Sequence, residues 1–230
     1  MFLLEGNIGV GKSTFLRLVQ EHCPELSVIQ EPMASWTSQD FGQSLLGNFY
    51  QEPSRWAYTI ETFAMLTRVK DLIELQNKRA LSGLMERSVY SGHYCFAKNG
   101  HLQGYFTNLE WQIYEQWFEF LVNRFCLPPQ GFVYLRADAD ACLERIKKRN
   151  RAGEEGMTRE YVEHIGQLHD SFLMGKKDVA VSLKHVPVLV LDASQNLLTN
   201  KELLLHYIGK VKAFMQTVQP ARREQKSLQA

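Results

Sequence analysis

A glycine-rich segment near the start of the chain, GNIGVGKST, fits the pattern G-x-x-x-x-G-K-[ST]. It follows a short apolar run typical of a strand and precedes FLRLVQ, which is typical of the first turns of a helix. A strand, a glycine-rich turn and a helix N-terminus aim several backbone N–H groups at one point, which suits a polyphosphate. We therefore expect this segment to bind a nucleoside triphosphate, through Gly6, Asn7, Ile8, Gly9, Val10, Gly11, Lys12, Ser13 and Thr14.

Two side chains of this segment carry specific chemistry. We expect the Lys12 ammonium group to reach the β- and γ-phosphates and the Ser13 hydroxyl group to bind Mg²⁺. The alternative is a chance glycine-rich turn, but the pattern and its flanks agree, which argues against chance.

The elements that position these residues follow from the apolar pattern. β-Branched, apolar runs recur at 2–4, 26–29, 83–85, 131–135 and 186–191, separated by long amphipathic stretches. This alternation predicts an α/β fold with a five-stranded parallel sheet covered by helices on both faces. A chain of 230 residues is long enough for one sizeable core, so we expect one domain over 1–215. The polar segment 216–230 is expected to be a flexible tail.

Two long helices are expected between the strands. Residues 55–80 have apolar side chains at helical spacing, and 108–125 is unusually rich in aromatic residues. The aromatic side chains of the second helix fall on several of its faces. Burial on more than one side follows, either in an ordinary core or in a subunit interface.

Polar residues follow several of the expected strands. Glu31 comes after the second strand, Glu86-Arg87-Ser88 after the third, and a helix carrying Arg145, Arg149 and Arg151 after the fourth. Any one of them alone is more often a solvated charge or a helix cap. Because ligands bind at the carboxyl ends of parallel strands, together they indicate a single site.

The composition excludes several classes of function. The chain is 45% hydrophobic and 22% charged with a net charge of +1, which argues against a nucleic-acid-binding surface. No apolar run approaches the ~20 residues of a membrane-spanning helix, and we expect no signal peptide and no membrane partner. The four cysteines show no C-x-x-C pairing, and the histidines lack metal-ligand spacing. A cytoplasmic enzyme is consistent with all of these observations.

Taken together, these motifs resemble those of the deoxynucleoside kinase family, whose members include deoxycytidine, deoxyguanosine and mitochondrial thymidine kinases. The resemblance covers residue 1 to about residue 195 and rests on segments in the family's order, namely GNIGVGKST, EPMASW, YQEPSRW, ERS, the arginines of 145–151 and VPVLVLD. It implies a P-loop kinase fold with an arginine-bearing lid at about 145–157. It also implies transfer of phosphate from ATP, with Mg²⁺, to the 5′-hydroxyl group of a deoxynucleoside.

The resemblance also implies catalytic roles. A sugar hydroxyl group is a poor nucleophile, and Glu31 stands at the family's general-base position. Lys12, Arg87 and the lid arginines Arg145, Arg149 and Arg151 would supply positive charge around the transferring phosphoryl group. Ser13 and Glu86 would hold Mg²⁺, and Asp192 belongs to the ATP site.

On the substrate side, Tyr50 matches a residue that holds the sugar 3′-hydroxyl group. One of Glu154 and Glu155 matches its partner, and the alignment through the lid favours Glu154. Trp36 and Phe96 match aromatic residues that flank the base, although an isolated phenylalanine is more often part of the core.

The base-reading positions depart from the family. Glu61 stands where family members have glutamine, and Gly92 stands where an aspartate partners the arginine that matches Arg68. We expect Gly92 to enlarge the pocket and to leave Arg68 free to pair with Glu61 or to reach a base carbonyl group. An ionised Glu61 only accepts hydrogen bonds, which suits the adjacent N–H groups of guanine.

The sequence therefore favours a purine deoxynucleoside, with deoxyguanosine first. A protonated Glu61 would act like glutamine and would restore binding of cytosine or adenine, so a deoxycytidine, deoxyadenosine or broad-specificity kinase is the alternative. A nucleoside monophosphate kinase or a catalytically silent structural subunit with this fold are alternatives of other classes. The resemblance also implies a homodimer formed through the helices that contain Arg68 and Trp111.

Overall fold

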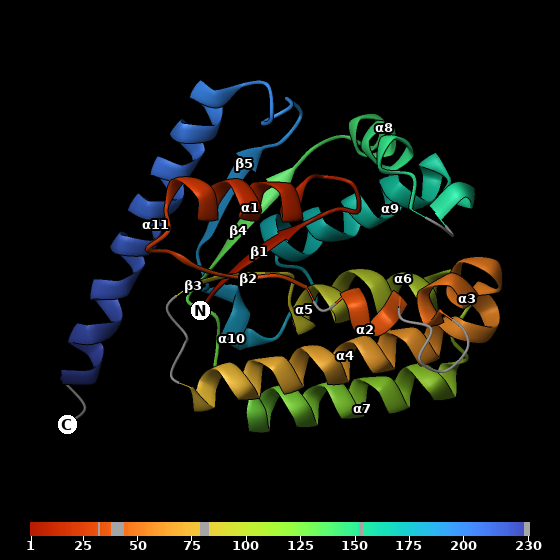
Figure 1. The fold of residues 1–230 in the computed structure, drawn as a ribbon. Coiled ribbons are helices and arrows are strands. Elements are labelled where there is room, and N and C mark those ends of the chain that lie inside the picture. The colour runs from red at the N-terminus through yellow and green to blue at the C-terminus, as the bar shows by residue number, and fades with distance from the viewer. Residues whose placement is uncertain (32, 38–43, 79–82, 152–153, 228–230) are drawn as a thin grey trace.

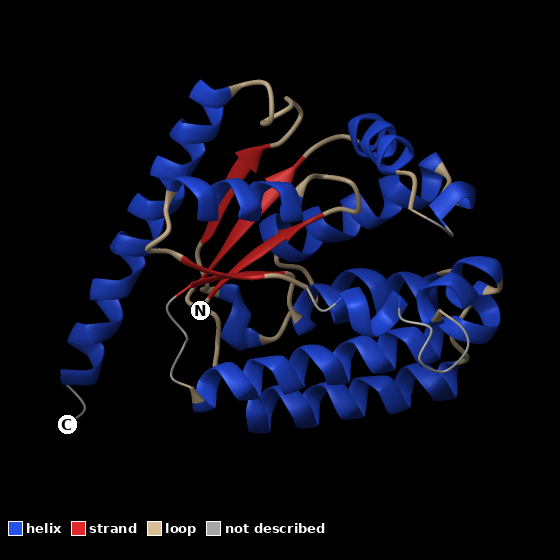
Figure 2. Cartoon of the chain, in the orientation of Figure 1, coloured by secondary structure: helices blue, strands red, loops and turns tan. Residues whose placement is uncertain are grey.

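The computed structural model describes residues 1–31, 33–37, 44–78, 83–151 and 154–227. Its centre is a five-stranded sheet in the order β2-β3-β1-β4-β5, drawn in red in Figure 2. All four strand pairs are parallel. The strands are β1 Phe2–Gly6, β2 Ser27–Ile29, β3 Gly83–Glu86, β4 Gly131–Arg136 and β5 Val188–Asp192. The expected α/β fold is confirmed, with strand ends that differ from the expected ones by one or two residues.

Alternate residues of the central strand face opposite sides of the sheet. Leu3 belongs to one buried cluster, whereas Phe2 and Leu4 belong to another. This alternation follows from the two-residue repeat of a strand and gives the sheet two hydrophobic faces. Each face is covered by its own set of helices (Figure 1).

Helices α1, α8 and α11 contribute to the cluster on one face of the sheet. They span Lys12–His22, Ala139–Arg149 and Lys201–Ser227. The Asp138 side chain caps the start of α8 by accepting a hydrogen bond from the Ala141 backbone N–H, and Asn150, in a left-handed conformation, ends it.

The opposite face is covered by more elements, which include the two long helices. Helix α4 spans Pro53–Asn77, with proline in its first turn, and α7 spans Asn108–Phe125 behind a capping box of Thr107 and Glu110. The cluster on this face also has residues from α5 Val89–Ser91, π-helical η1 Gly92–Ala97, α9 Arg159–Asp170, π-helical η3 Ser171–Gly175 and α10 Val181–Lys184. Helix α9 contributes to the cluster on the first face as well, and α6 Lys98–Leu102 packs against η1 and α9. Short helices α2 Met33–Thr37 and α3 Leu45–Gln51 pack beside α4, and the 3₁₀ turn η2 Glu154–Gly156 precedes α9.

The two expected long helices are confirmed, except that the end of the first at 80 lies outside the described residues. In α7, Tyr114 and Phe118 are buried in the core, whereas Trp117 and Phe120 are half exposed. The aromatic residues of this helix therefore serve a core and an outer surface at once.

Two features concern the ends and the surface of the chain. Helix α11 continues to Ser227, so the backbone of the expected tail from 216 is helical up to that residue. Its flexibility stays a prediction. Among the described residues, no helix is both long and apolar enough to cross a membrane.

Candidate active site

A cavity of about 630 Å³ opens where the carboxyl ends of the strands meet the helices. Its walls come from the glycine-rich loop, the residues that follow β2, β3 and β5, and helices α4, α8 and α9. The sequence-predicted site residues that line it are Ile8, Gly9, Val10, Gly11, Lys12, Ser13, Thr14, Glu31, Trp36, Tyr50, Glu61, Arg68, Glu86, Arg87, Phe96, Arg145, Arg149, Arg151 and Glu154.

The glycine-rich loop wraps around the buried Lys12 side chain. The Lys12 ammonium group donates to the carbonyl oxygens of Gly6 and Asn7, at 3.0 and 2.8 Å. Burial, reinforced by Arg87, lowers the pKa of Lys12 to about 7. Gly6, Gly9 and Gly11 have positive φ, which side chains rarely adopt, so the loop needs glycine there. Gly6 and Asn7 lie outside the cavity lining, where Asn7 fastens the loop to the Val162 carbonyl oxygen of α9.

The pair expected to hold Mg²⁺ is present. The Ser13 hydroxyl group donates to Oε1 of Glu86 at 2.7 Å, and both side chains line the cavity. A hydroxyl group beside a carboxylate is an oxygen-only donor set, as Mg²⁺ prefers.

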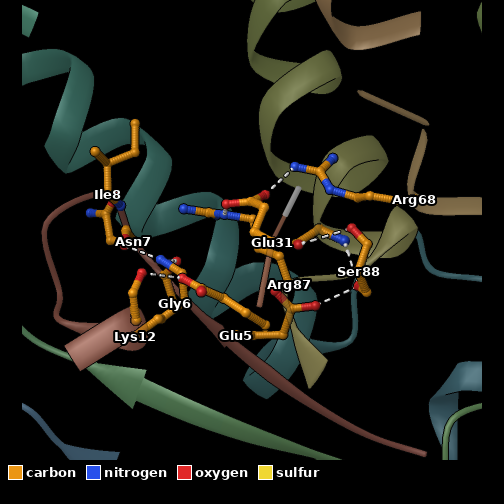
Figure 3. Close-up of polar contacts among 12 residues, drawn as sticks. Glu5, Gly6, Asn7, Ile8, Lys12, Glu31, Arg68, Arg87 and Ser88 are labelled. Atoms are coloured by element: carbon orange, nitrogen blue, oxygen red, sulfur yellow. Dashed lines mark hydrogen bonds and ion pairs between the residues drawn. The ribbon is translucent and has the colours of Figure 1, made fainter. Parts of the chain in front are cut away.

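Glu31 lies between two arginines that come from different elements. Its Oε1 accepts from Nη2 of Arg68 on α4 at 2.6 Å, and its Oε2 accepts from Nε of Arg87 after β3 at 3.3 Å (Figure 3). All three side chains are almost completely buried. Burial alone would raise the pKa of Glu31, but Arg87, Arg68 and Lys12 together outweigh it and hold that pKa below its ordinary value.

The backbone at Arg87 is strained in a way that aims its side chain. Arg87 has a φ of 60°, which is uncommon for residues other than glycine, and its backbone N–H donates to the Leu4 carbonyl oxygen at 2.8 Å. The next residue, Ser88, caps α5 and donates its hydroxyl hydrogen to the buried Glu5 (Figure 3). Strand β1 therefore holds the turn from both sides and directs Arg87 toward Glu31.

Glu61 lines the cavity on the same helix as Arg68. Burial raises its pKa to about 7, against the opposing fields of Arg68 and Arg87. Arg68 forms its ion pair with Glu31 and not with Glu61, which differs from one of the two expected arrangements.

Gly92 does not enlarge the cavity, contrary to the expectation. It is buried outside the cavity lining, and a Cβ atom at this position would lie 2.7 Å from Nη1 of Arg68. The space left by the missing side chain is therefore taken by the Arg68 guanidinium group itself.

Aromatic side chains flank the two arginines. The Arg87 guanidinium group lies over the ring of Phe96 at 4.5 Å, and that of Arg68 lies over Trp36 at 4.8 Å. Tyr50 also lines the cavity, and burial, with Glu154 nearby, raises the pKa of its hydroxyl group. The cavity wall therefore offers aromatic rings, which can pack against a flat ring, and the Tyr50 hydroxyl group, which can form a hydrogen bond with a sugar.

The segment expected to form the lid contains a second carboxylate between arginines. Arg149 donates to both oxygens of Glu154, at 2.8 and 2.7 Å from Nη2, and Arg151 contacts Oε1 at 3.4 Å. Arg145 instead donates to backbone carbonyl oxygens of Val10 and Ser194. Arg145 therefore ties the glycine-rich loop to the loop after β5. Helix α8 ends at Arg149, so Arg151 lies beyond it, as expected.

Comparison with known proteins decides the family. The sequence model of the deoxynucleoside kinase family matches residues 2–216. Deoxycytidine kinase 2 of Gallus gallus is 37% identical, over 92% of this chain and 89% of that protein. Deoxycytidine kinase of Homo sapiens is 33% identical over 94% and 90%, and mitochondrial deoxyguanosine kinase of Xenopus laevis is 34% identical over 92% and 88%. The chain belongs to the deoxynucleoside kinase family. It is accordingly a phosphotransferase that uses ATP and a deoxynucleoside.

Sequence reasoning missed several residues of this kinase's cavity. Tyr161 of α9 is one, and no motif marks it, because it reaches the cavity only through the packing of α9. The stretch 193–198 after β5 is another, and its place after a strand end could have pointed to it. Asp192 does not line the cavity, although it was expected in the ATP site; its carboxylate accepts from the Ser194 backbone N–H and shapes this stretch. The side chain of Glu155 lies outside the described residues.

Proposed function

We propose that this kinase transfers the γ-phosphoryl group of ATP to the 5′-hydroxyl group of a deoxynucleoside, with purine deoxynucleosides preferred and deoxyguanosine first. The observation that carries the proposal is the buried carboxylate of Glu31, which faces the same cavity as the glycine-rich loop and is flanked by Arg68 and Arg87. A carboxylate at this place can accept the proton of a sugar hydroxyl group while the phosphoryl group is held by positive charge.

Different groups of lining residues have different parts in this reaction. Lys12, Arg87 and the lid arginines Arg149 and Arg151 surround the phosphates with positive charge, which is the main protein contribution to phosphoryl transfer. Arg145 acts indirectly, because it fixes the loops on both sides of the nucleotide. Ser13 and Glu86 would hold Mg²⁺, which neutralises phosphate charge when bound.

The sugar and base bind beside the phosphate-binding groups, because Glu154 of the sugar site is paired with Arg149 and Arg151. Tyr50 and Glu154 both line the cavity wall and are close enough to influence each other's charge, which suits a shared hold on the 3′-hydroxyl group. Trp36 and Phe96 contribute aromatic rings beside the base. Glu61 reads the edge of the base.

The preference for guanine depends on the charge of Glu61. An ionised carboxylate can accept from the N1–H and N2–H₂ groups of guanine together, whereas a neutral carboxyl group both donates and accepts and suits cytosine or adenine. Since the pKa of Glu61 is about 7, both forms exist near neutral pH. This favours deoxyguanosine with deoxycytidine as the second candidate, in keeping with relatives that are named for each of these substrates.

The test is an ADP-release assay with Mg-ATP and each of the four deoxynucleosides, with dTMP and with no acceptor. We expect turnover with deoxynucleosides, highest for deoxyguanosine. A preference for deoxycytidine would contradict the base assignment but leave the kinase reaction intact. Turnover with dTMP alone would indicate a monophosphate kinase, and bound ATP without any turnover would favour a structural subunit.

We also propose a homodimer. Large apolar side chains are exposed along the outer layer formed by α4 and α7, which lie side by side in Figure 1: Leu66, Leu109, Ile113, Trp117 and Phe120. A patch of this kind on two adjacent helices fits a second copy of the chain. We expect Trp117→Glu to halve the mass measured by light scattering, whereas Val181→Glu, an equally polar change at an exposed residue of α10, leaves it unchanged.

We infer a reducing compartment, the cytoplasm, for this chain. Cys23, Cys95, Cys126 and Cys142 are all free thiols, as is usual in compartments that keep cysteine thiols reduced. Cell fractionation with a cytosolic and a mitochondrial marker tests the assignment, since one relative is mitochondrial by name.

A further inference from the structure

The guanidinium group of Arg68 has hydrogen-bond partners for only some of its N–H groups. Nη2 donates to Glu31, but Nε and Nη1 are buried and have no hydrogen-bond partner among the described residues. Within those residues, Glu31 is the carboxylate within ion-pair distance of this arginine. A buried N–H group without an acceptor costs free energy, so the guanidinium group gains whenever a new acceptor comes within reach.

Gly92 permits this position. A Cβ atom there would lie 2.7 Å from Nη1, so any side chain at 92 would displace the guanidinium group. The Trp36 ring lies 4.8 Å from the guanidinium carbon and bounds it on another side. Arg68 therefore sits between Gly92 and the cavity, with Glu31 as its anchor on the cavity side.

The anchor affects the chemistry of Glu31. A general base must accept a proton, and each cationic neighbour makes that less favourable. The charged groups that face Glu31 are Arg68 and Glu61 from α4, Arg87 after β3 and Lys12 of α1. Both guanidinium groups lie over an aromatic ring, but Arg87 is also held by its strained backbone, and among the described residues only its Nη1 is buried without a partner, whereas Nε and Nη1 of Arg68 both are. Of the two arginines bound to Glu31, Arg68 is therefore the one that gains more hydrogen bonds when a new acceptor comes within reach.

We propose that Arg68 is a positioning residue that couples base binding to the basicity of Glu31. An acceptor atom of the bound base draws the guanidinium group away from Oε1 of Glu31. That oxygen then accepts the proton of the 5′-hydroxyl group while the 5′-oxygen bonds to the γ-phosphorus and ADP leaves. The coupling rests on the proposed function, and it gives the kinase a way to delay catalysis until a base is in place.

The sharpest test uses an acceptor without a base, 1,2-dideoxyribose, with saturating Mg-ATP. Such a sugar cannot draw Arg68 away, so the wild-type kcat is expected to be low. Arg68→Met removes the anchor, and we expect it to raise kcat for the sugar about tenfold or more, within the range of general-base effects. An arginine that merely contacts the base would give no such gain. An unchanged or lower kcat for the sugar overturns the proposal.

The pH profiles provide a second readout. Arg68→Met is expected to raise the pKa of the acidic limb of kcat/KM, which reports the enzyme before the deoxynucleoside binds. The acidic limb of kcat, which reports the bound complex, is expected to stay in place. Equal shifts of both limbs mean that Arg68 stays on Glu31 throughout, and the proposal is then wrong.

A second variant keeps Arg68, so it tests the coupling even if Arg68→Met does not fold. Gly92→Asp offers the guanidinium group another carboxylate on the side away from Glu31, so it is also expected to raise sugar turnover. Lys70→Met, the same kind of change on the solvent side of α4, is the control and is expected to change neither acceptor's rate. If wild type phosphorylates none of the four deoxynucleosides, the proposed function fails and the coupling with it. If it phosphorylates them but neither variant gains sugar turnover, only the coupling fails.

Discussion

Two clusters of side chains that line the cavity have the same composition, a glutamate between two arginines. In the first, Glu31 contacts Arg68 and Arg87, and the three side chains are only 6–8% exposed. In the second, Glu154 is 3% exposed, but its partners Arg149 and Arg151 are 36% and 35% exposed. The same three charges are therefore almost completely buried in one cluster, whereas in the other cluster the two arginines are about one third exposed to water.

The difference in solvation assigns different tasks to the two clusters. Charges interact strongly in a buried site and are screened by water and salt near the surface. In the buried cluster, the two arginines can control how readily Glu31 accepts a proton. In the lid cluster, the fork of Arg149 on Glu154 mainly fixes geometry, since most of the charge effect is screened.

The largest expected effect comes from a substitution of Glu31, the carboxylate at the centre of the buried cluster. Glu31→Gln removes the proposed proton acceptor, so we expect the rate constant of phosphoryl transfer, measured in single-turnover assays, to fall by a factor of about 10²–10⁴. It also leaves two buried guanidinium groups without a counter-charge, and loss of one partner of a buried pair costs about 3–5 kcal/mol of stability. Denaturant unfolding measures the second effect.

Glu52→Gln is the matched control, because Glu52 is exposed and its side chain makes no capping hydrogen bond. We expect wild-type rate and stability for this variant. A Glu31→Gln variant that keeps its kcat would remove Glu31 from the mechanism, whatever its stability.

The contacts of the lid cluster were not predicted from the sequence, but they are local in the chain, unlike those of the buried cluster. Arg149, Arg151 and Glu154 are close along the chain, so their contacts follow from one helix end and one turn. Residues 31, 68 and 87 meet only because β2, β3 and α4 are packed around one sheet edge. The strand-end positions of Glu31 and Arg87 could be predicted, but the choice of Glu31 over Glu61 as the partner of Arg68 could not, because it depends on side-chain packing.

The fold and the glycine-rich phosphate loop could be predicted because each has a strong local pattern in the sequence. The apolar runs fix the strands, and the pattern around Lys12 fixes the phosphate loop. Gly92 shows the limit of this reasoning. A missing side chain indicates space, but the neighbour that fills the space is decided by the whole fold, and here Arg68 fills it. Tyr161 likewise reaches the cavity through the packing of α9 alone.

The second-largest expected effect comes from a substitution of Glu154, the carboxylate at the centre of the lid cluster. Glu154→Gln weakens the proposed hydrogen bond to the sugar 3′-hydroxyl group, so we expect kcat/KM for the deoxynucleoside to fall ~10–100-fold, the equivalent of one charged hydrogen bond. Stability is expected to change by less than about 1 kcal/mol, because the partner arginines are exposed to water. With a 2′,3′-dideoxynucleoside, the variant and wild type are expected to differ little. A stability loss as large as that of Glu31→Gln would show that the two clusters do not differ as described.

A smaller effect concerns Glu61, which lies beside the buried cluster. Its pKa of about 7 means that the ionised form increases as the pH rises through that value. Because the ionised form suits guanine and the neutral form suits cytosine, we expect the ratio of kcat/KM for deoxyguanosine to that for deoxycytidine to rise about tenfold between pH 6 and pH 8, within the worth of one charged hydrogen bond. Glu61→Gln is expected to remove this pH dependence. A ratio that stays flat with pH in the wild type would contradict the assignment of Glu61 to the base.

The smallest effect separates the two arginines of the lid. Lysine keeps the charge of arginine but cannot form a two-bond fork. Arg149 donates to both oxygens of Glu154, whereas Arg151 makes one contact at 3.4 Å. We therefore expect Arg149→Lys to raise KM for the deoxynucleoside about fivefold, the equivalent of about 1 kcal/mol, and Arg151→Lys to raise it less than about twofold. Because these side chains are a third exposed, the difference should shrink in high salt, whereas effects in the buried cluster should persist. Equal salt sensitivity in the two clusters would mean that solvation does not separate their tasks.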